Sequence, residues 1–312
     1  MKALVTGGAG FIGSNLVKML LLEGHTVTVL DNLKSGYQSN LNPFPELKFI
    51  EGDIRNGKVV NQAMGGIEVI FHLAASVGNT RSIEHPIEDS EINVLGTLQI
   101  LEAARKHGVR KVIYSSSAGI FGELKTLPIC EDHQIEPDSP YGVSKLAGEK
   151  HCLAFAKLYS SLECICLRYF NVYGVNQRYD AYGNVIPIFA YRMLNEKPII
   201  IFGDGEQTRD FVNVQDVVQA NYKAALSEGI SGAFNIASGT CITINLLVDM
   251  MSEASGIEPD VEHSSPRQGD VRHSLANISA AGASFGYDPV IDLEQGLEEY
   301  MLWFSGELNK ER

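Results

Sequence analysis

The stretch MKALVTGGAGFIG, residues 1–13, decides the fold of this chain. A short apolar run ends in glycines, and Gly7, Gly10 and Gly13 recur at every third position. Such glycines allow a tight turn, the approach of the backbone to a pyrophosphate and the packing of a helix on a strand. Because the helical pattern of residues 14–22 follows directly, the stretch predicts a dinucleotide-binding unit of strand, phosphate turn and helix.

The next strand-like run supports this prediction. Residues 26–30 are β-branched and apolar, and the run ends at Asp31, 18 residues after Gly13. A carboxylate at this place can accept hydrogen bonds from a ribose diol and repels a 2′-phosphate. The sequence therefore favours NAD over NADP.

Strand-like and helical patterns continue to alternate through the first half of the chain. The strand-like runs lie at residues 3–6, 26–30, 47–50, 68–73, 111–114 and 163–167, and long helical patterns lie at 92–106 and 140–158. Strands that are apolar on both faces predict a parallel sheet covered by helices. Right-handed crossovers then give an α/β fold with a doubly wound parallel sheet of the Rossmann type.

The pattern changes after residue 172, where Gly, Asn and Pro become frequent and short strands mix with helices. We therefore predict two domains. The first is an NAD-binding Rossmann domain at residues 1–172. The second is a smaller mixed α/β substrate domain at residues 173–312, and we expect some crossing of the chain back to the first.

Composition excludes several classes of protein. The 312 residues are 45% hydrophobic and carry a formal net charge of −13, which argues against disorder and against nucleic-acid or anionic-membrane partners. No apolar run approaches the roughly 18 residues of a membrane span. Five cysteines without a CxxC pair indicate neither a disulfide framework nor a zinc site. We expect a cytoplasmic enzyme without a metal.

A group of polar residues predicts the chemistry. Tyr141 and Lys145 are four residues apart, on one face of a predicted helix. A neighbouring ammonium, together with a positive nicotinamide ring, would lower the pKa of the tyrosine and make it a base. Ser115, Ser116 and Ser117 follow the strand at 111–114, at the sheet edge where ligands bind. A hydroxyl there can share the proton of a substrate hydroxyl.

Together, these motifs resemble the extended short-chain dehydrogenase/reductases and, within them, nucleotide-sugar 4-epimerases of the UDP-glucose and UDP-N-acetylglucosamine type. The resemblance covers nearly the whole chain and includes TGGAGFIGS at 6–14, LDNLKSG at 30–36, GDI at 52–54, FHLAA at 71–75, NVLGT at 93–97, SPYGVSK at 139–145, LRYFNVYG at 167–174, TRDFVNVQDV at 208–217 and RQGDVRHS at 267–274. It implies NAD-dependent inversion of C4 of a UDP-hexose through a transient 4-keto sugar, with no net redox change.

The resemblance also implies the residues of the site. The catalytic residues would be Ser117, Tyr141 and Lys145, with Ser116 as the alternative hydroxyl. The NAD-binding residues would be Gly7, Gly10, Phe11, Ile12, Gly13, Asp31, Asn32, Lys34, Ser35, Gly36, Asp53, Ile54, Leu73, Ala74, Ala75, Asn93, Ser115, Tyr141, Lys145 and Phe170. The residues that bind the UDP-sugar in the second domain and the cleft would be Ser117, Tyr141, Asn171, Asn184, Val185, Phe202, Arg209, Arg267 and Ser274.

One position bears on the choice of sugar. In the epimerases that the chain resembles, the residue seven positions after the second phosphate-binding arginine limits the substituent at C2. Counting from Arg267 gives Ser274, which leaves room for a 2-acetamido group where a tyrosine would not. This predicts UDP-GlcNAc/UDP-GalNAc interconversion, with UDP-Glc/UDP-Gal as a further pair. Because residues 173–312 carry a net charge of −11, binding of the anionic UDP must rest on local donors, chiefly Arg209 and Arg267.

Two other functions stay open from the sequence. Nucleotide-sugar 4,6-dehydratases and decarboxylases carry a carboxylate just after the strand-end hydroxyl residue, where this chain has Ala118, Gly119 and Ile120. An NAD-sensing regulatory protein of the same fold typically lacks the tyrosine or the lysine, and both are present here. Helices near 88–107 and 140–158 match a pair that forms a four-helix interface in relatives, so we also expect a homodimer.

Overall fold

The computed structural model of the chain describes residues 1–180, 183–266 and 271–311. Its centre is a seven-stranded sheet in the order β11-β6-β5-β4-β1-β2-β3, in which all neighbours are parallel. The strands are β1 (Lys2–Thr6), β2 (Thr26–Asp31), β3 (Lys48–Glu51), β4 (Val69–His72), β5 (Lys111–Ser117), β6 (Glu163–Tyr169) and β11 (Gly232–Ile236). The predicted doubly wound parallel sheet is confirmed.

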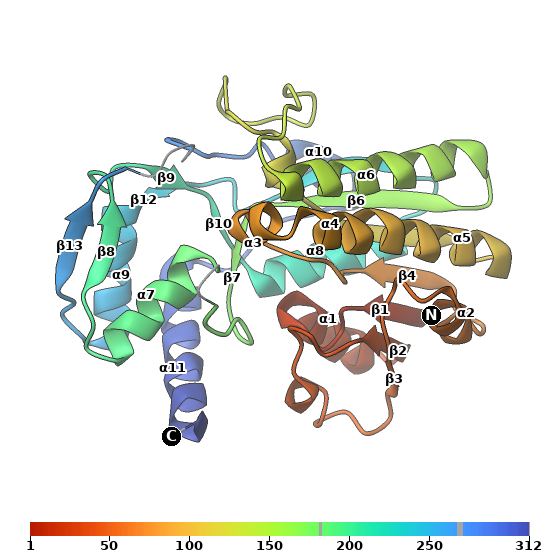
Figure 1. Cartoon of the computed structure of the whole chain (residues 1–312), viewed down its shortest axis with the longest axis horizontal. Helices are drawn as coiled ribbons and strands as arrows, with labels where there is room; N and C mark the ends of the chain where they lie inside the picture. Colours follow the sequence, from red (N-terminus) through yellow and green to blue (C-terminus); the bar gives the residue numbers. More distant parts are fainter. Residues whose placement is uncertain (181–182, 267–270, 312) are drawn as a thin grey trace.

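Helices cover both faces of this sheet (Figure 1). On one face lie α1 (Phe11–Leu22), α8 (Val214–Leu226) and α10 (Ser279–Phe285), and on the other α2 (Gly57–Ala63), α5 (Thr97–His107) and α6 (Pro140–Leu158). Successive residues of β1 point into alternate layers, since Ala3 and Val5 pack on the first layer and Leu4 on the second. Because both faces of the sheet are buried, the sequences of its strands are continuous apolar runs.

A smaller region lies beside the large sheet (Figure 1). It contains three strand pairs, namely β7 (Asn171–Tyr173) with β10 (Phe211–Asn213), β8 (Ile199–Phe202) with β13 (Val261–Ser264), and β9 (Thr208–Arg209) with β12 (Ile242–Thr243). Its helices include α7 (Val185–Leu194), α9 (Ile244–Ser255) and α11 (Leu293–Glu311). These elements enclose a core of their own, centred on Phe189, Leu247 and Tyr300.

The chain passes between the two regions more than once. After β10 it returns through α8 to β11, which pairs with β6 at the edge of the large sheet. Residues 214–236 therefore belong to the first region, although they follow the expected boundary at residue 172, and α10 joins the same region later in the chain. The expected crossing of the chain takes this form, and the boundary itself stays a prediction.

Local boundaries differ from the sequence prediction in two places. The helix expected at 14–22 begins at Phe11, because its first turn lies inside the glycine motif. The helix expected at 92–106 is interrupted, since η2 (Glu91–Gly96) has π-helical turns before α5 begins. At this point the Thr97 hydroxyl donates to the carbonyl of Asn93 at 2.7 Å.

Among the described residues, none of the helices combines the length and the apolar character that crossing a membrane requires.

Candidate functional site

The glycine turn between β1 and α1 leaves no room for side chains at two positions. Gly7 has a φ of +71°, a conformation that favours glycine, and a Cβ there would lie 2.7 Å from the backbone nitrogen of Ala74. A Cβ on Gly13 would lie 2.1 Å from the carbonyl oxygen of Gly7. The turn, the first helix and the loop after β4 therefore meet backbone to backbone.

The first turn of α1 is suited to an anion. Gly10 is its N-cap residue, and no side chain in the described part of the chain caps the helix. The amides of Phe11 and Ile12 lie in this first turn, where backbone N–H groups have no partner within the helix. With the positive end of the helix dipole, these donors fit the pyrophosphate of a dinucleotide.

Asp31 lies at the end of β2, beside this turn. Its carboxylate accepts the backbone N–H groups of Ala9 at 2.9 Å and Leu33 at 2.8 Å. Burial raises the pKa of Asp31, and these two hydrogen bonds oppose the rise. Each carboxylate oxygen keeps a further lone pair, so the group can still accept ribose hydroxyls. A Cβ on Gly36 would lie 3.1 Å from this carboxylate, which places the loop after β2 against it.

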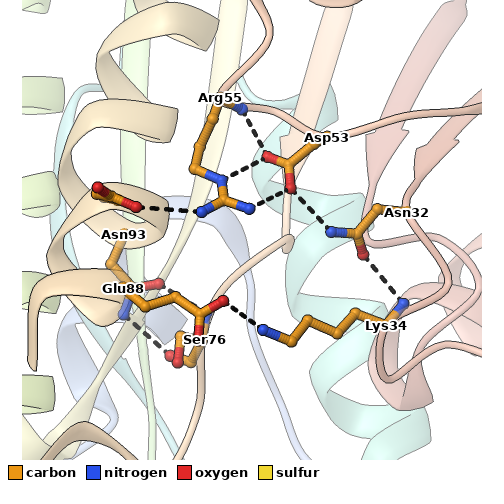
Figure 2. Close-up of polar contacts among 8 residues, drawn as sticks. Asn32, Lys34, Asp53, Arg55, Ser76, Glu88 and Asn93 are labelled. Carbon is orange, nitrogen blue, oxygen red and sulfur yellow. Dashed lines mark hydrogen bonds and ion pairs between the residues drawn. The ribbon is translucent and has the colours of Figure 1, made fainter. Parts of the chain in front are cut away.

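Figure 2 shows the polar network next to Asp31, at the expected adenosine end of the site. Asp53 accepts hydrogen bonds from the guanidinium of Arg55, with Nη2–Oδ2 at 2.8 Å, and from the amide of Asn32 at 3.1 Å. The Arg55 guanidinium beside Asp53 holds the pKa of that carboxyl at about 2. Arg55, which was not predicted, also contacts Glu91 at 3.2 Å. The network therefore ties the loop after β3 to the start of the helix that contains Asn93.

An ion pair joins the other side of this network. The Lys34 ammonium donates to the Glu88 carboxylate of α4 (Pro86–Ser90), so that the loop after β2 is bridged to that helix (Figure 2). The carboxylate draws the ammonium toward α4. The predicted contact of Lys34 with the adenosine ribose stays a prediction, and Glu88 is a partner that the sequence did not indicate.

The remaining residues predicted around the adenosine and nicotinamide lie along the same edge of the sheet. They are Ser35, Ile54, Leu73, Ala74, Ala75, Asn93, Ser115 and Phe170. Ala74 contacts Gly7 through its backbone, and Ile54 is buried against Gly96. Phe170 follows β6 and packs on Phe121, with ring centroids 6.5 Å apart. Each of them follows or ends a strand of the large sheet or lies in the helix beside it.

The side chain of Asn93 is occupied within the protein. It accepts the backbone N–H of Ser76 at 2.8 Å and donates to the Ser76 carbonyl at 2.9 Å (Figure 2). Its amide nitrogen also lies 3.0 Å from the hydroxyl of Ser144 and 3.2 Å from the carboxylate of Asp89. These contacts fix the loop after β4 to α4 and α6.

The three predicted catalytic residues come together at the start of α6. Ser139 caps this helix by accepting the N–H of Gly142, and Tyr141 and Lys145 follow on one face. The Ser117 hydroxyl, at the end of β5, accepts the N–H of Gly119 at 3.1 Å. Because a backbone amide occupies a lone pair of this oxygen, its own proton is directed to another acceptor.

Burial sets the direction of the pKa shifts of Tyr141 and Lys145. Burial raises the pKa of Tyr141, and the neighbouring Ser117 hydroxyl opposes the rise. Burial also lowers the pKa of Lys145 to about 8, with Asp89 and Glu149 acting against the change. The expected lowering of the pKa of Tyr141 requires the positive nicotinamide ring as well as the ammonium, so it stays a prediction.

The three serines of β5 divide between two faces. Ser116 points into the layer of α6 and donates to the carboxylate of Glu149 at 2.8 Å. Ser117 lies on the other face, near Tyr141, since a Cβ on Gly119 would lie 3.4 Å from the Ser117 hydroxyl oxygen and 3.7 Å from two ring carbons of Tyr141. Ser115 shares that face of the strand. Of the two hydroxyls left open by the sequence, the geometry favours Ser117.

Behind Ser116 lies a buried ion pair that the sequence analysis missed. Arg168 of β6 donates to both oxygens of Glu149, with Nη2–Oε1 at 2.8 Å and Nε–Oε2 at 3.0 Å. The two residues are 3% and 0% exposed. Arg168 also donates to the carbonyl of Glu131 at 2.8 Å. A charged residue inside the apolar run of β6 was the available signal, because a buried charge needs a partner.

The predicted sugar-side residues lie in and around the smaller region. A cleft of about 590 Å³ is lined by Phe202, Gly203, Asp204, Gln207, His263, Ser264, Pro266, Val271 and Arg272. At its rim, Arg272 forms a two-bonded ion pair with Asp204 at 2.6 and 2.9 Å. Of the predicted residues, Phe202 therefore lines the cleft.

Two other residues predicted to bind the UDP-sugar, Arg209 and Asn171, lie in short strands of the smaller region. Arg209 lies in β9, whose Thr208 N–H donates to the carbonyl of Arg272 at 2.9 Å. Asn171 begins β7 and donates to the carbonyl of Asp210 at 3.1 Å.

Asn184 is the N-cap residue of α7 and Val185 its first residue. Ser274 is 7% exposed, and Ala276 beside it packs with Ile120 and Phe170. Arg267 lies outside the described residues.

Comparison with known proteins decides the family. Residues 3–237 match the model of the NAD dependent epimerase/dehydratase family, and they include the glycine turn and the tyrosine–lysine pair. The chain belongs to this family. NAD is accordingly the cofactor of this epimerase/dehydratase family member, and the glycine turn and Asp31 are suited to hold it.

Individual relatives of this family member act on, or are bound to, different UDP-sugars. A putative UDP-glucose 4-epimerase of Methanocaldococcus jannaschii is 41% identical over 303 residues, which cover 96% of this chain and 97% of that protein. A UDP-N-acetylglucosamine 4-epimerase from Methanobrevibacter ruminantium, solved with UDP-N-acetylmuramic acid, has a TM-score of 0.93 at 35% identity and 98% coverage of both chains. A UDP-glucuronic acid 4-epimerase from Bacillus cereus, solved with UDP-glucuronic acid and NAD, has a TM-score of 0.91 at 32% identity and covers 99% of this chain and 100% of that one.

Proposed function

We propose that this enzyme interconverts UDP-GlcNAc and UDP-GalNAc by inversion at C4, with UDP-Glc and UDP-Gal as a further pair. NAD-dependent 4-epimerisation of UDP-sugars is the activity that its relatives share, and the chain is an isomerase of that kind. The observation that carries the reaction is that Ser117 and Tyr141 lie on either side of Gly119, at the sheet edge that also holds the glycine turn. The choice of sugar rests on Ser274.

NAD held at the glycine turn and beside Asp31 would supply a hydride acceptor and then a hydride donor at C4 of the sugar. Tyr141 takes the proton of the C4 hydroxyl, with Ser117 sharing that proton, and returns a proton to the C4 oxygen when the keto group is reduced. The ammonium of Lys145 stabilises the tyrosine in its deprotonated form. Arg209 and Arg267 hold the diphosphate with planar pairs of donors, so that the UDP is fixed while the sugar can turn.

The neighbourhood of Ser117 argues against the dehydratase alternative. Ala118, Gly119 and Ile120 form the short helix η3 directly after it and provide no carboxylate. Elimination across C5 and C6 needs a second acid and base beside the tyrosine. Mass spectrometry separates the two reactions, because a dehydratase or decarboxylase product loses water or CO₂ and an epimer keeps its mass.

The direct test is an assay of the purified protein with each candidate sugar. We expect NMR to detect C4 epimers of UDP-GlcNAc and of UDP-glucose, with faster conversion of UDP-GlcNAc. UDP-glucuronate forms a third arm, since one relative acts on it. Conversion of UDP-glucuronate alone would contradict the proposed substrate, and conversion of no UDP-sugar would contradict the proposed reaction.

Replacing Ser274 by tyrosine is expected to reverse the sugar preference. The side chain is 7% exposed, so a phenol ring there would fill space that the 2-acetamido group needs. We expect kcat/KM for UDP-GlcNAc to fall about 10- to 100-fold while that for UDP-glucose is largely kept. Ser279→Tyr, the same change at an exposed position, is the control. Equal losses on both sugars would show that Ser274 does not select the substituent.

We also propose that the enzyme is a homodimer joined through the helices on the α4–α6 side of the sheet. Ile87, Leu95 and Val143 on this side are 76%, 55% and 53% exposed, which is unusual for large apolar side chains clustered on neighbouring helices. The family resemblance points to the same helices.

Replacing Leu95 by glutamate is therefore expected to convert a dimer into a monomer of 34.1 kDa, measured by light scattering after size-exclusion chromatography. A buried glutamate without a partner opposes association. Leu302→Glu, at a residue of α11 that is 79% exposed, is the matched control and should leave the mass unchanged. A wild-type protein that is already monomeric at micromolar concentration would contradict the proposal.

A further inference from the structure

We propose that Tyr114 is a positioning residue for catalysis, whose aromatic ring holds the ammonium of Lys145 in place and in its charged form. This inference rests on the proposed function, because it concerns the same site. Tyr114 lies in β5, three residues before Ser117.

The first observation is the contact between ring and ammonium. The Nζ atom of Lys145 lies 4.6 Å from the centroid of the Tyr114 ring. The face of an aromatic ring carries negative charge density, so a cation within about 6 Å of the centroid is attracted to it. Tyr114 and Lys145 are 1% and 2% exposed, so that water does not compete for the contact.

The second observation is that Tyr114 also contacts the backbone of Lys145. The Tyr114 hydroxyl donates to the carbonyl oxygen of Lys145 at 3.3 Å. A Cβ at Gly148 would lie 2.2 Å from the Tyr114 hydroxyl oxygen, so this turn of α6 approaches the tyrosine only because residue 148 is glycine. Tyr114 therefore contacts both ends of Lys145, its backbone and its ammonium.

The third observation is that the carboxylates around Lys145 are held by other groups. Asp89 of α4 accepts the Ser144 hydroxyl, and Glu149 of α6 is paired with Arg168. Among the ion pairs of the described residues, none includes Lys145. Asp89 and Glu149 oppose the fall in the pKa of Lys145 without forming an ion pair with it, whereas the ring of Tyr114 contacts the ammonium directly and favours its charge.

The remaining titratable groups that face Lys145 are neutral. Burial lowers the pKa of His72 in β4 to about 3, and its ring nitrogens contact the hydroxyls of two threonines. Burial raises the pKa of the thiols of Cys152 in α6 and Cys166 in β6. Tyr141, in α6 with Lys145, is also protonated before it accepts a substrate proton, because burial raises its pKa. Without the ring, these groups offer little to offset the removal of the ammonium from water.

The test compares three substitutions at position 114. Tyr114→Phe keeps the ring and removes the hydroxyl, whereas Tyr114→Leu and Tyr114→Met fill the space without a ring. The kcat and KM of the NAD-loaded enzyme are measured from about pH 6 to about pH 10. Circular dichroism identifies any variant that fails to fold, and methionine serves as the second ring-free variant if leucine does not fold.

The ring favours the charged lysine, so its removal should lower the pH at which that charge is lost. In the pH profile of kcat, we expect the loss of activity on the alkaline side to occur about one pH unit lower in the ring-free variants, with KM little changed. Tyr114→Phe should keep most of the activity and lose it at the same alkaline pH as the wild type. The inference would be overturned if the folded leucine and methionine variants lost activity at the same alkaline pH as the wild type. It would also be overturned if Tyr114→Phe shifted that pH as much as they do.

A second readout separates this inference from the proposed function. The titration of the Lys145 ammonium can be followed by NMR in the folded protein, without any substrate. We expect its pKa to be lower in Tyr114→Leu than in Tyr114→Phe. If no UDP-sugar is converted but this difference is found, the proposed function fails and the inference about Tyr114 holds. If conversion occurs without the difference, the inference fails.

Discussion

Replacing Tyr141 by phenylalanine is expected to lower kcat about 10²- to 10⁴-fold, the usual loss when a general acid–base group is removed. Phenylalanine keeps the ring of Tyr141 at the start of α6 and removes only the hydroxyl. The proton of the C4 hydroxyl then loses the acceptor that the proposed mechanism assigns to it. The measurement is a steady-state assay of C4 epimerisation with UDP-GlcNAc and UDP-glucose.

The control for this substitution lies on the same helix. Tyr159 is the C-cap residue of α6, and Tyr159→Phe makes the same chemical change far from Ser117. We expect wild-type turnover for that variant and an unchanged NAD content for both. Undiminished turnover in Tyr141→Phe would contradict the mechanism, because no other residue of the site has been assigned the proton.

Replacing Arg168 by methionine is expected to lower the free energy of unfolding by about 3–5 kcal/mol. The substitution leaves the Glu149 carboxylate, which is 0% exposed, without the guanidinium that now bonds both of its oxygens. A buried charge without a partner is costly, whereas a pair of well-packed apolar residues in the same space is often neutral. The double variant Arg168→Met with Glu149→Met should therefore recover most of the loss.

Urea unfolding followed by circular dichroism measures these differences. Arg105→Met is the matched control, since Arg105 pairs with Glu102 on the surface and such a pair contributes about 0–1 kcal/mol. If Arg168→Met cost no more than Arg105→Met, the buried pair would not be important for stability. If the double variant were as unstable as the single one, the loss would come from packing and not from charge.

The sequence was sufficient for the sheet and for the main parts of the site because both depend on local patterns. The glycine turn, Asp31 at a strand end and the spacing of Tyr141 and Lys145 each indicate a function within a short stretch. The fold then brings these stretches to one edge of the sheet, as parallel topology requires. The resemblance already favoured Ser117 over Ser116, and the pleat of β5 supports this choice because Ser116 faces Glu149.

The missed features join residues far apart in the chain. The contact of Arg168 with Glu149 and that of Lys34 with Glu88 have no fixed spacing, so no short pattern indicates them. The π-helical turns before α5 contain Asn93, whose side chain bonds to Ser144, a residue far away in the chain.

The return of the chain to the large sheet has a consequence for synthesis on the ribosome. β11 is the edge strand that completes the sheet beside β6, and α8 covers one of its faces, yet both follow most of the strands of the smaller region. The NAD-binding part therefore cannot finish folding until residue 236 has been synthesised. The cofactor and substrate regions are thus built as one cooperative unit, and a fragment that ends at residue 172 would expose the apolar surface that α8 and β11 cover.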